Sequence, residues 1–246
     1  MGNPAPEINT SFEVEIREAS DVPAIAPVRL LWTDVPFGTG KVQCQRGLAY
    51  DDPSDTGYVI GALSKWVRLM ANNGTVVVCC DYRLAADVVE AICDRCAWIY
   101  RGEIIWEFGL GRPRKTWWPV RHNNLLTFTA TDKSGIFNTS AIPRTKRLSP
   151  KPGYPDDKPS GSVWEYTMNN TNPERVGYPN QKPTAIIEPF VLAHTMPGDL
   201  VVDPFMGSGS TGVAALRHGR HFYGADTNVE AVKIAHQRLL DVCAHF

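Results

Sequence analysis

The sequence has few cysteines, no long apolar run and almost no net charge. Six cysteines in 246 residues are too few for a disulfide scaffold. No apolar run approaches the length of a membrane span. The first residues lack both a basic region and a hydrophobic region, so we expect no secretory signal. These absences predict a cytoplasmic protein with reduced thiols and no membrane association.

Metal-ligand patterns are also scarce. Cys93 and Cys96 have the spacing of zinc or redox ligands, but no second pair accompanies them and they fall in a helical stretch. Ordinary thiols are therefore favoured over a zinc or redox site. The histidines near the C-terminus form no ligand set with an acidic partner. We expect no metal ion.

The net charge of −1 hides an uneven distribution. Residues 101–160 hold eleven Lys/Arg and five Asp/Glu, which gives +6, so the rest of the chain carries −7. Such a basic region suits a polyanion-binding face, although a solvated loop region fits the charge equally well. Trp117 and Trp118 interleave with these cations and could stack on bases. The cations that we expect to bind a nucleic acid backbone are Arg112, Arg114, Lys115, Arg144, Lys146 and Arg147.

Apolar periodicity predicts strands that alternate with helices. Strands are expected at Phe12–Ile16, Val28–Thr33, Thr75–Cys80, Trp98–Trp106, Asn123–Thr129, Leu200–Asp203 and His221–Asp226. Helices are expected at Thr56–Asn72 (with Gly74 as its C-cap), Leu84–Cys96, Thr184–Thr195, Ser210–His218 and Asn228–Val242. This alternation predicts an α/β fold, with a mostly parallel sheet and helices on both faces. Residues 131–178 are rich in proline and glycine and predict a loop-rich insert.

A glycine-rich turn follows the predicted strand Leu200–Asp203. Gly207, Gly209 and Gly212 fit the pattern G-x-G-x-x-G between a strand and a helix, where backbone can approach a ligand closely. Asp226 ends the next strand, at the position where an acidic side chain binds ribose hydroxyls. A nicotinamide or flavin dinucleotide and S-adenosylmethionine both fit, as does a purely structural turn. The dinucleotide is less favoured, because its loop usually lies near the start of a domain.

Three motifs resemble those of the DNA amino-methyltransferases. Asp203–Thr211 closely resembles the cofactor motif D-P-F-x-G-S-G-T-T. Tyr178–Pro183 resembles the H-P-T-Q-K-P motif that precedes it in that family. Thr33–Gly38 stands where the family has its catalytic D-P-P-Y, with Val35 in place of the first proline. Weaker likenesses between these motifs extend the resemblance over residues 28–240.

The order of these motifs is similar to the permuted β class, in which the catalytic motif comes first and the cofactor motif last. The resemblance implies a Rossmann-like methyltransferase fold that binds S-adenosylmethionine. It also implies a catalytic half at 1–130, a target-recognition insert at 131–178 and a cofactor-binding half at 179–246. The implied function is site-specific DNA methylation, as in restriction–modification, on the exocyclic amino group of a flipped base. Double-stranded DNA is the expected partner, and a homodimer is left open.

The resemblance assigns roles to individual residues. Asp34 and the backbone carbonyl of Val35 would accept the two amino hydrogens and so free the nitrogen lone pair, beside Pro36. Phe37 offers a flat face to the flipped base. Phe205 would pack against the cofactor adenine. The expected cofactor-binding residues are Lys182, Asp203, Phe205, Gly207, Ser208, Gly209, Thr211 and Asp226.

The target base is chosen by resemblance alone, because the acceptor pair suits adenine N6 and cytosine N4 equally. Adenine enzymes of the β class mostly have Asp at the position of Asp34, whereas cytosine enzymes mostly have Ser. Adenine N6 is therefore favoured. Two alternatives stay open: an N4-cytosine methyltransferase, and a catalytically weak DNA-binding relative in which Val35 marks the loss of activity.

Overall fold

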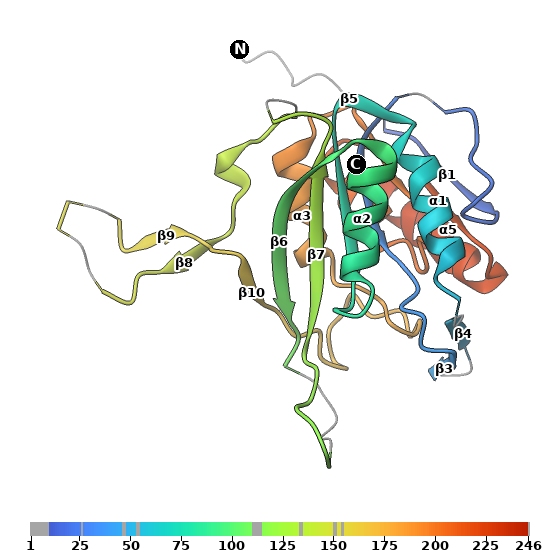
Figure 1. Ribbon diagram of the computed structural model, residues 1–246, viewed down its shortest axis with the longest axis horizontal. Coiled ribbons are helices and arrows are strands. Elements are labelled where there is room, and N and C mark those ends of the chain that lie inside the picture. The colour runs from blue at the N-terminus through green and yellow to red at the C-terminus, as the bar shows by residue number, and fades with distance from the viewer. Residues whose placement is uncertain are drawn as a thin grey trace.

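An eight-stranded sheet forms the centre of the protein (Figure 1). The computed structural model describes residues 10–25, 27–45, 48–52, 55–109, 115–132, 135–149, 152–153 and 155–245. All neighbouring strands of the sheet are parallel except at β7, which is antiparallel to β5 and β6. The strand order is β1 (Phe12–Ile16), β12 (His221–Asp226), β11 (Leu200–Asp203), β2 (Val28–Asp34), β5 (Met70–Cys80), β7 (His122–Thr129), β6 (Ile99–Glu107) and β10 (Val163–Glu165).

Helices cover both faces of this sheet. On one face lie α1 (Gly57–Val67) and α2 (Ala85–Cys96), and on the other lie α3 (Thr184–His194), α4 (Ser210–Arg217) and α5 (Val229–Cys243). Because side chains alternate along a strand, Cys80 packs in the first core and its neighbour Cys79 in the second. The predicted α/β fold is confirmed. Within the described residues, no helix has the length and apolar character needed to cross a membrane.

The first helix is shorter than its sequence pattern indicates. We expected a helix to Asn72 with Gly74 as its cap, but α1 ends at Val67 and β5 already begins at Met70. Gly74 lies inside β5, where a Cβ would come within 3.1 Å of the Val28 carbonyl oxygen. The apolar residues that continued the helical pattern therefore belong to a strand pressed against β2, next to an irregularity in their register. The predicted C-cap is wrong.

Three segments project from the sheet. The hairpin of β3 (Lys41–Gln45) and β4 (Leu48–Asp52) was not predicted. It extends beyond the end where β2 and β5 finish, as do residues 115–121 of the β6–β7 connection (Figure 1). An arm of β8 (Arg144–Lys146) and β9 (Asp157–Pro159) instead projects sideways from the β10 edge of the sheet, following the 3-10 turn η1 (Thr139–Ala141). The sequence between residues 131 and 178 thus contains short strands, and β10 extends the main sheet in parallel beside β6.

The strand order of the sheet reverses between β2 and β11, which are adjacent and parallel. From β2 the chain continues through α1 on one face, and from β11 it continues through α4 on the other. In open α/β sheets, the carboxyl ends of the strands at such a reversal border a crevice that binds ligands. The predicted catalytic and cofactor motifs both begin at this place.

The glycine at position 212 permits close contact between α4 and the sheet. A Cβ there would lie 2.6 Å from the Phe222 ring and 2.8 Å from Leu239. Gly212→Ala should therefore destabilise the protein by about 1–3 kcal/mol, because overpacking forces the neighbours apart. The matched control is Gly61→Ala in α1, where a Cβ meets no atom within 4 Å. It should be neutral or stabilising by up to about 1 kcal/mol. Urea unfolding measures both, and equal effects would contradict this account.

Candidate active site

A pocket opens at the carboxyl ends of β2, β11 and β12, and the segment 178–182 closes one side of it. The predicted catalytic residues Asp34 to Phe37 all line it. From the predicted cofactor set it is lined by Lys182, Asp203, Phe205, Gly207, Ser208, Thr211 and Asp226. The structure therefore brings together two groups of residues that lie about 170 positions apart in the chain.

The glycine loop begins α4 with a left-handed residue. Gly209 is the N-cap of the helix and has φ of +77°, a conformation that a side chain disfavours. The Gly207 N–H donates to Asp226 Oδ2 at 2.9 Å, and the Asn228 N–H donates to Asp226 Oδ1 at 2.8 Å. Burial raises the pKa of Asp226, and these backbone donors oppose the rise. Asp226 therefore shapes the loop, and its contact with a ribose stays a prediction.

Asp203 connects the catalytic strand with the cofactor loop. Its carboxylate accepts from the Thr33 hydroxyl at 2.7 Å, from the Thr211 hydroxyl at 2.6 Å and from the Phe205 N–H at 3.1 Å. Burial raises the pKa of Asp203 to about 7, although these donors lower it. Three protein donors already bind this carboxylate, so its clearest role is structural, and direct contact with a cofactor stays a prediction.

The residue that departs from the family motif is well packed. Val35 is 1% exposed and belongs to the core beside α1 and α2. Its N–H donates to the Cys79 carbonyl at 3.2 Å. A proline has no N–H and could not make this bond. The hydrogen bond to β5 thus fixes the backbone where the family uses a proline ring.

The loop after Phe37 is held by a side chain that the sequence did not single out. Asp52, at the end of β4, is 1% exposed and accepts from the backbone N–H groups of Gly38 at 3.0 Å and Thr39 at 3.1 Å. It also lines the pocket. Asp52 therefore fixes the exit of the catalytic motif, and only the unpredicted β3–β4 hairpin brings it there.

Lys182 lies against Asp34. Its ammonium forms an ion pair with Asp34 Oδ2, donates to the Asn180 carbonyl at 3.3 Å and lies 5.5 Å from the centre of the Phe37 ring. Burial disfavours the charged ammonium, but the nearby Asp34 outweighs it and raises the pKa of Lys182. The structure thus pairs this residue with the carboxylate of Asp34, while the catalytic role of Asp34 and the contact of Lys182 with a cofactor stay predictions.

Several buried polar atoms in the pocket have no hydrogen-bond partner among the described residues. They are Asp34 Oδ1, Trp32 Nε1 and the Tyr178 hydroxyl, which are buried atoms of residues that line the pocket. Buried polar groups are nearly always hydrogen-bonded, so three exceptions in one pocket indicate a site for a polar ligand. Trp32 and Tyr178 were not among the predicted site residues. Tyr178 stands in the H-P-T-Q-K-P-like motif, which is the signal that could have found it.

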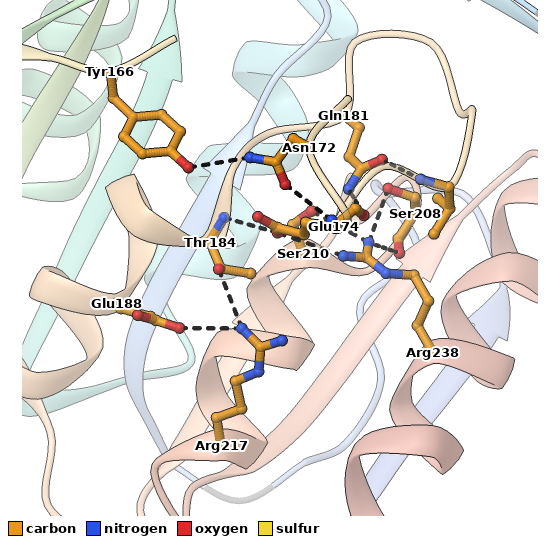
Figure 2. A network of polar contacts seen from close by, with 11 residues as sticks. Tyr166, Asn172, Glu174, Gln181, Thr184, Glu188, Ser208, Ser210, Arg217 and Arg238 are labelled. Atoms are coloured by element: carbon orange, nitrogen blue, oxygen red, sulfur yellow. Dashed lines mark hydrogen bonds and ion pairs between the residues drawn. The ribbon is translucent and has the colours of Figure 1, made fainter. Parts of the chain in front are cut away.

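A polar network holds the 174–182 segment against the cofactor loop (Figure 2). Arg238 of α5 donates to the Ser208 carbonyl at 2.6 Å and forms an ion pair with Glu174 at 3.6 Å. Glu174 also accepts from the Thr184 N–H at 2.9 Å, at the start of α3. Burial lowers the pKa of Arg238 to about 10, and Glu174 opposes this effect. The two motifs on either side of the pocket are thus joined beneath it.

Comparison with known proteins identifies the family. A model of the N6/N4 DNA methylases, described as DNA methylase, matches residues 28–237. The chain belongs to the N6/N4 DNA methylase family. The predicted resemblance and the general prediction of a DNA amino-methyltransferase are confirmed.

Two curated methyltransferases are each 26% identical to this chain over the aligned residues. Type II methyltransferase M.HpaI of Haemophilus parainfluenzae is 26% identical over 216 residues, which cover 86% of this chain and 68% of that one. DNA adenine methyltransferase YhdJ of Escherichia coli strain K12 is 26% identical over 244 residues, which cover 94% and 82%. These matches span most of each chain.

Solved structures of DNA methylases share the fold. PvuII DNA methyltransferase, named as cytosine-N4-specific, superimposes with a TM-score of 0.73 at 17% identity, over 96% of this chain and 93% of that one. M1.HpyAVI in complex with SAM superimposes with a TM-score of 0.69 at 21% identity, over 93% and 98%. The predicted methyltransferase fold is confirmed.

The predicted DNA-binding residues that the structure describes lie in two separate places. Arg112 and Arg114 fall outside the described residues. Lys115 is exposed on the β6–β7 connection, near Trp117 and Trp118, which are 71% and 80% exposed. Arg144, Lys146 and Arg147 lie on or next to the β8–β9 arm at the sheet edge. The structure therefore does not unite the predicted DNA-binding cations in one patch.

Arg144 and Arg147 of the arm also bind within it. Arg144 donates to both carboxylate oxygens of Asp157, at 2.7 and 2.8 Å, and Arg147 donates to the Pro155 carbonyl at 2.8 Å. Lys146 is exposed. The charge that the arm presents is thus smaller than its sequence indicates, because Asp157 offsets Arg144.

The buried Asp203 should make stability depend on pH. Its pKa rises to about 7 in the folded protein, so between about pH 5 and pH 7 the folded state holds a proton that the unfolded state has lost. This group therefore destabilises the protein as pH rises, by about 1.4 kcal/mol per pH unit. Asp203→Asn removes the titration. Relative to the unmodified protein, its free energy of unfolding should increase as pH rises across this range in urea titrations.

A constant difference between the two proteins from pH 5 to pH 7 would contradict the raised pKa of Asp203. The matched control is Asp132→Asn. Asp132 is exposed and pairs only with Arg101 among the described residues. Its substitution should produce no comparable slope.

Proposed function

We propose that this DNA methylase transfers a methyl group from S-adenosylmethionine to the N6 amino group of adenine in double-stranded DNA. One observation carries the proposal. Asp34 lines the same pocket as the glycine loop, and its buried Oδ1 has no hydrogen-bond partner among the described residues. A hydrogen-bond acceptor aimed at an amino group and a cofactor loop are the two parts that the reaction needs.

The pocket fits the cofactor in its donors, acceptors and flat surfaces. Asp226 and the glycine loop would hold the ribose, and Phe205, whose ring makes an edge contact with Tyr58 at 6.0 Å, would face the adenine. Tyr178, whose hydroxyl has no hydrogen-bond partner among the described residues, lines the same pocket. When bound, the cofactor would supply an electrophilic methyl group on its sulfonium.

Asp34 and Val35 would act on the target nitrogen. The lone pair of an exocyclic amino group is delocalised into the ring, so the nitrogen is a poor nucleophile. Asp34 Oδ1 and the Val35 carbonyl would accept its two hydrogens and so favour a pyramidal nitrogen with an available lone pair. Transfer forms an N–C bond, breaks an S–C bond and releases one amino proton. Phe37, at the pocket wall, would stack on the flipped base.

Adenine is favoured by the carboxylate at position 34. In the family pattern, adenine enzymes mostly have Asp there and cytosine enzymes mostly Ser. The relative YhdJ is named as a DNA adenine methyltransferase. The backbone bond of Val35 to Cys79 favours an active enzyme over a weak DNA-binding relative, because the catalytic backbone is fixed despite the missing proline.

Nucleoside mass spectrometry on DNA treated with protein and S-adenosylmethionine tests this function. We expect N6-methyladenine with the unmodified protein and a loss of at least about 100-fold with Asp34→Ala, since one of the two acceptors is gone. Calorimetry should show that Asp34→Ala still binds S-adenosylmethionine, because Asp34 ends a different strand from the loop. N4-methylcytosine without N6-methyladenine would show the base assignment to be wrong, and NADH binding in place of S-adenosylmethionine would refute the cofactor.

We also propose that DNA contacts both the β6–β7 connection and the β8–β9 arm, in the cytoplasm. Replacing Arg144, Lys146 and Arg147 together with alanine should weaken DNA binding and make its salt dependence less steep. The log–log slope should fall by up to about 0.9 for each phosphate that the arm no longer neutralises. The matched control is Arg68→Ala, an exposed arginine at the opposite end of α1 from the pocket. If the triple variant keeps its affinity and slope at several salt concentrations, the arm does not bind the backbone.

A further inference from the structure

We infer that Lys182 is a positioning residue for Asp34, which it keeps ionised and orients so that Oδ1 faces the target amino group. This inference rests on the proposed function and extends it to a residue that sequence reasoning assigned to the cofactor. It depends on the contacts of Lys182, on the rigidity of its segment and on the charges around Asp34.

Lys182 contacts only one of the two carboxylate oxygens of Asp34. The ammonium of Lys182 binds Asp34 Oδ2 and leaves Oδ1 without a partner among the described residues. Both side chains are largely buried, with 10% exposure for Lys182 and 22% for Asp34. A carboxylate held through one oxygen has a fixed orientation, so the remaining oxygen presents its lone pairs in a set direction.

The backbone that carries Lys182 is fixed by buried polar contacts (Figure 2). The side-chain amide of Gln181 accepts from the Val176 N–H at 3.0 Å and donates to the Glu174 carbonyl at 2.8 Å. Asn180 has φ of +56°, and its carbonyl accepts from Lys182 itself. Glu174 is in turn held by Arg238 and by the Thr184 N–H. Lys182 therefore has little freedom to leave Asp34.

Among the groups around Asp34, Lys182 most favours its ionised form, although burial still holds the pKa of Asp34 above its usual range. Burial raises the pKa of Asp34, and Asp52 on β4 raises it further. Lys182 and the Cys79 thiol on β5 lower it. Asp203 on β11 faces Lys182 and supports its positive charge. Lys182 is the cation in this group. Without it, Asp34 would hold a proton at higher pH, and a protonated oxygen is a poorer acceptor.

The test compares Lys182→Met with Lys182→Arg. In Lys182→Met, the acid limb of the pH profile of kcat/KM for methyl transfer should move to higher pH by about 1–3 units, the range expected when a carboxylate loses an adjacent cation. Lys182→Arg keeps the charge and should restore most of the profile. S-adenosylmethionine affinity by calorimetry should change by less than about threefold in both. An unmoved acid limb together with a large loss of cofactor affinity would instead place Lys182 in the cofactor site and overturn the inference.

A second measurement separates this inference from the proposed function. The carboxyl carbon of Asp34 can be titrated by NMR in the unmodified protein and in Lys182→Met, with no DNA or turnover. If no DNA is methylated but the Asp34 titration moves up in Lys182→Met, Lys182 does stabilise the ionised Asp34 and it is the proposed function that fails. If DNA is methylated but the titration does not move, the inference fails. Lys233→Met, at an exposed ion pair on α5, is the control and should leave the titration unchanged. Lys182→Gln replaces Lys182→Met should the latter not fold.

Discussion

The buried carboxylate of Asp203 is the interaction on which the arrangement of the pocket depends. It accepts hydrogen bonds from Thr33 on β2 and from Thr211 on α4, which come from opposite parts of the chain. Burying an acid costs free energy unless the acid is hydrogen-bonded, and the three donors offset this cost for Asp203. Thr33 directly precedes Asp34, and Thr211 belongs to the cofactor loop. One buried group thus sets the distance between the catalytic strand and the cofactor loop.

The permuted order of the motifs has no effect on this geometry. β2 and β11 are separated by more than 160 residues, yet they are parallel neighbours and end at the same edge of the sheet. Parallel pairing places the carboxyl ends of both strands together whichever strand comes first in the chain. The chain therefore builds its crevice from two βα units in either order, and the connecting segments carry the loops that surround the pocket.

Sequence periodicity and motifs predicted the central sheet and the two pocket motifs, because these features are local. The ends of β11 and β12 agree with the predicted ranges. β10 was missed, since three residues are too few to show an alternation, and β3 was missed although Val42 and Cys44 alternate with polar residues. Gly74 was misread because a glycine after an apolar run signals a helix end as readily as a close strand contact.

The contacts that explain the site were beyond sequence reasoning for another reason. Lys182 and Asp34 are 148 positions apart, and Glu174 and Arg238 meet only because α5 packs beneath the cofactor loop. No local pattern reports which lysine faces which carboxylate. The motif indicated Lys182 as a pocket residue, but only the fold shows that it forms an ion pair with Asp34.

The charges that line the pocket decide between the two ligand classes that the glycine loop allows. Four carboxyl groups border it, on Asp34, Asp52, Asp203 and Asp226, against two cations, Lys182 and Arg17. Arg17 is already paired with Glu15 and Asp21, and Lys182 with Asp34. The Gly207 N–H, which would have to receive a pyrophosphate, is bound to Asp226. A dinucleotide would therefore bring two negative charges to a wall that four carboxyl groups border. A sulfonium cofactor brings positive charge to the same carboxyl groups, so the electrostatics of the pocket favour methyl transfer over hydride transfer.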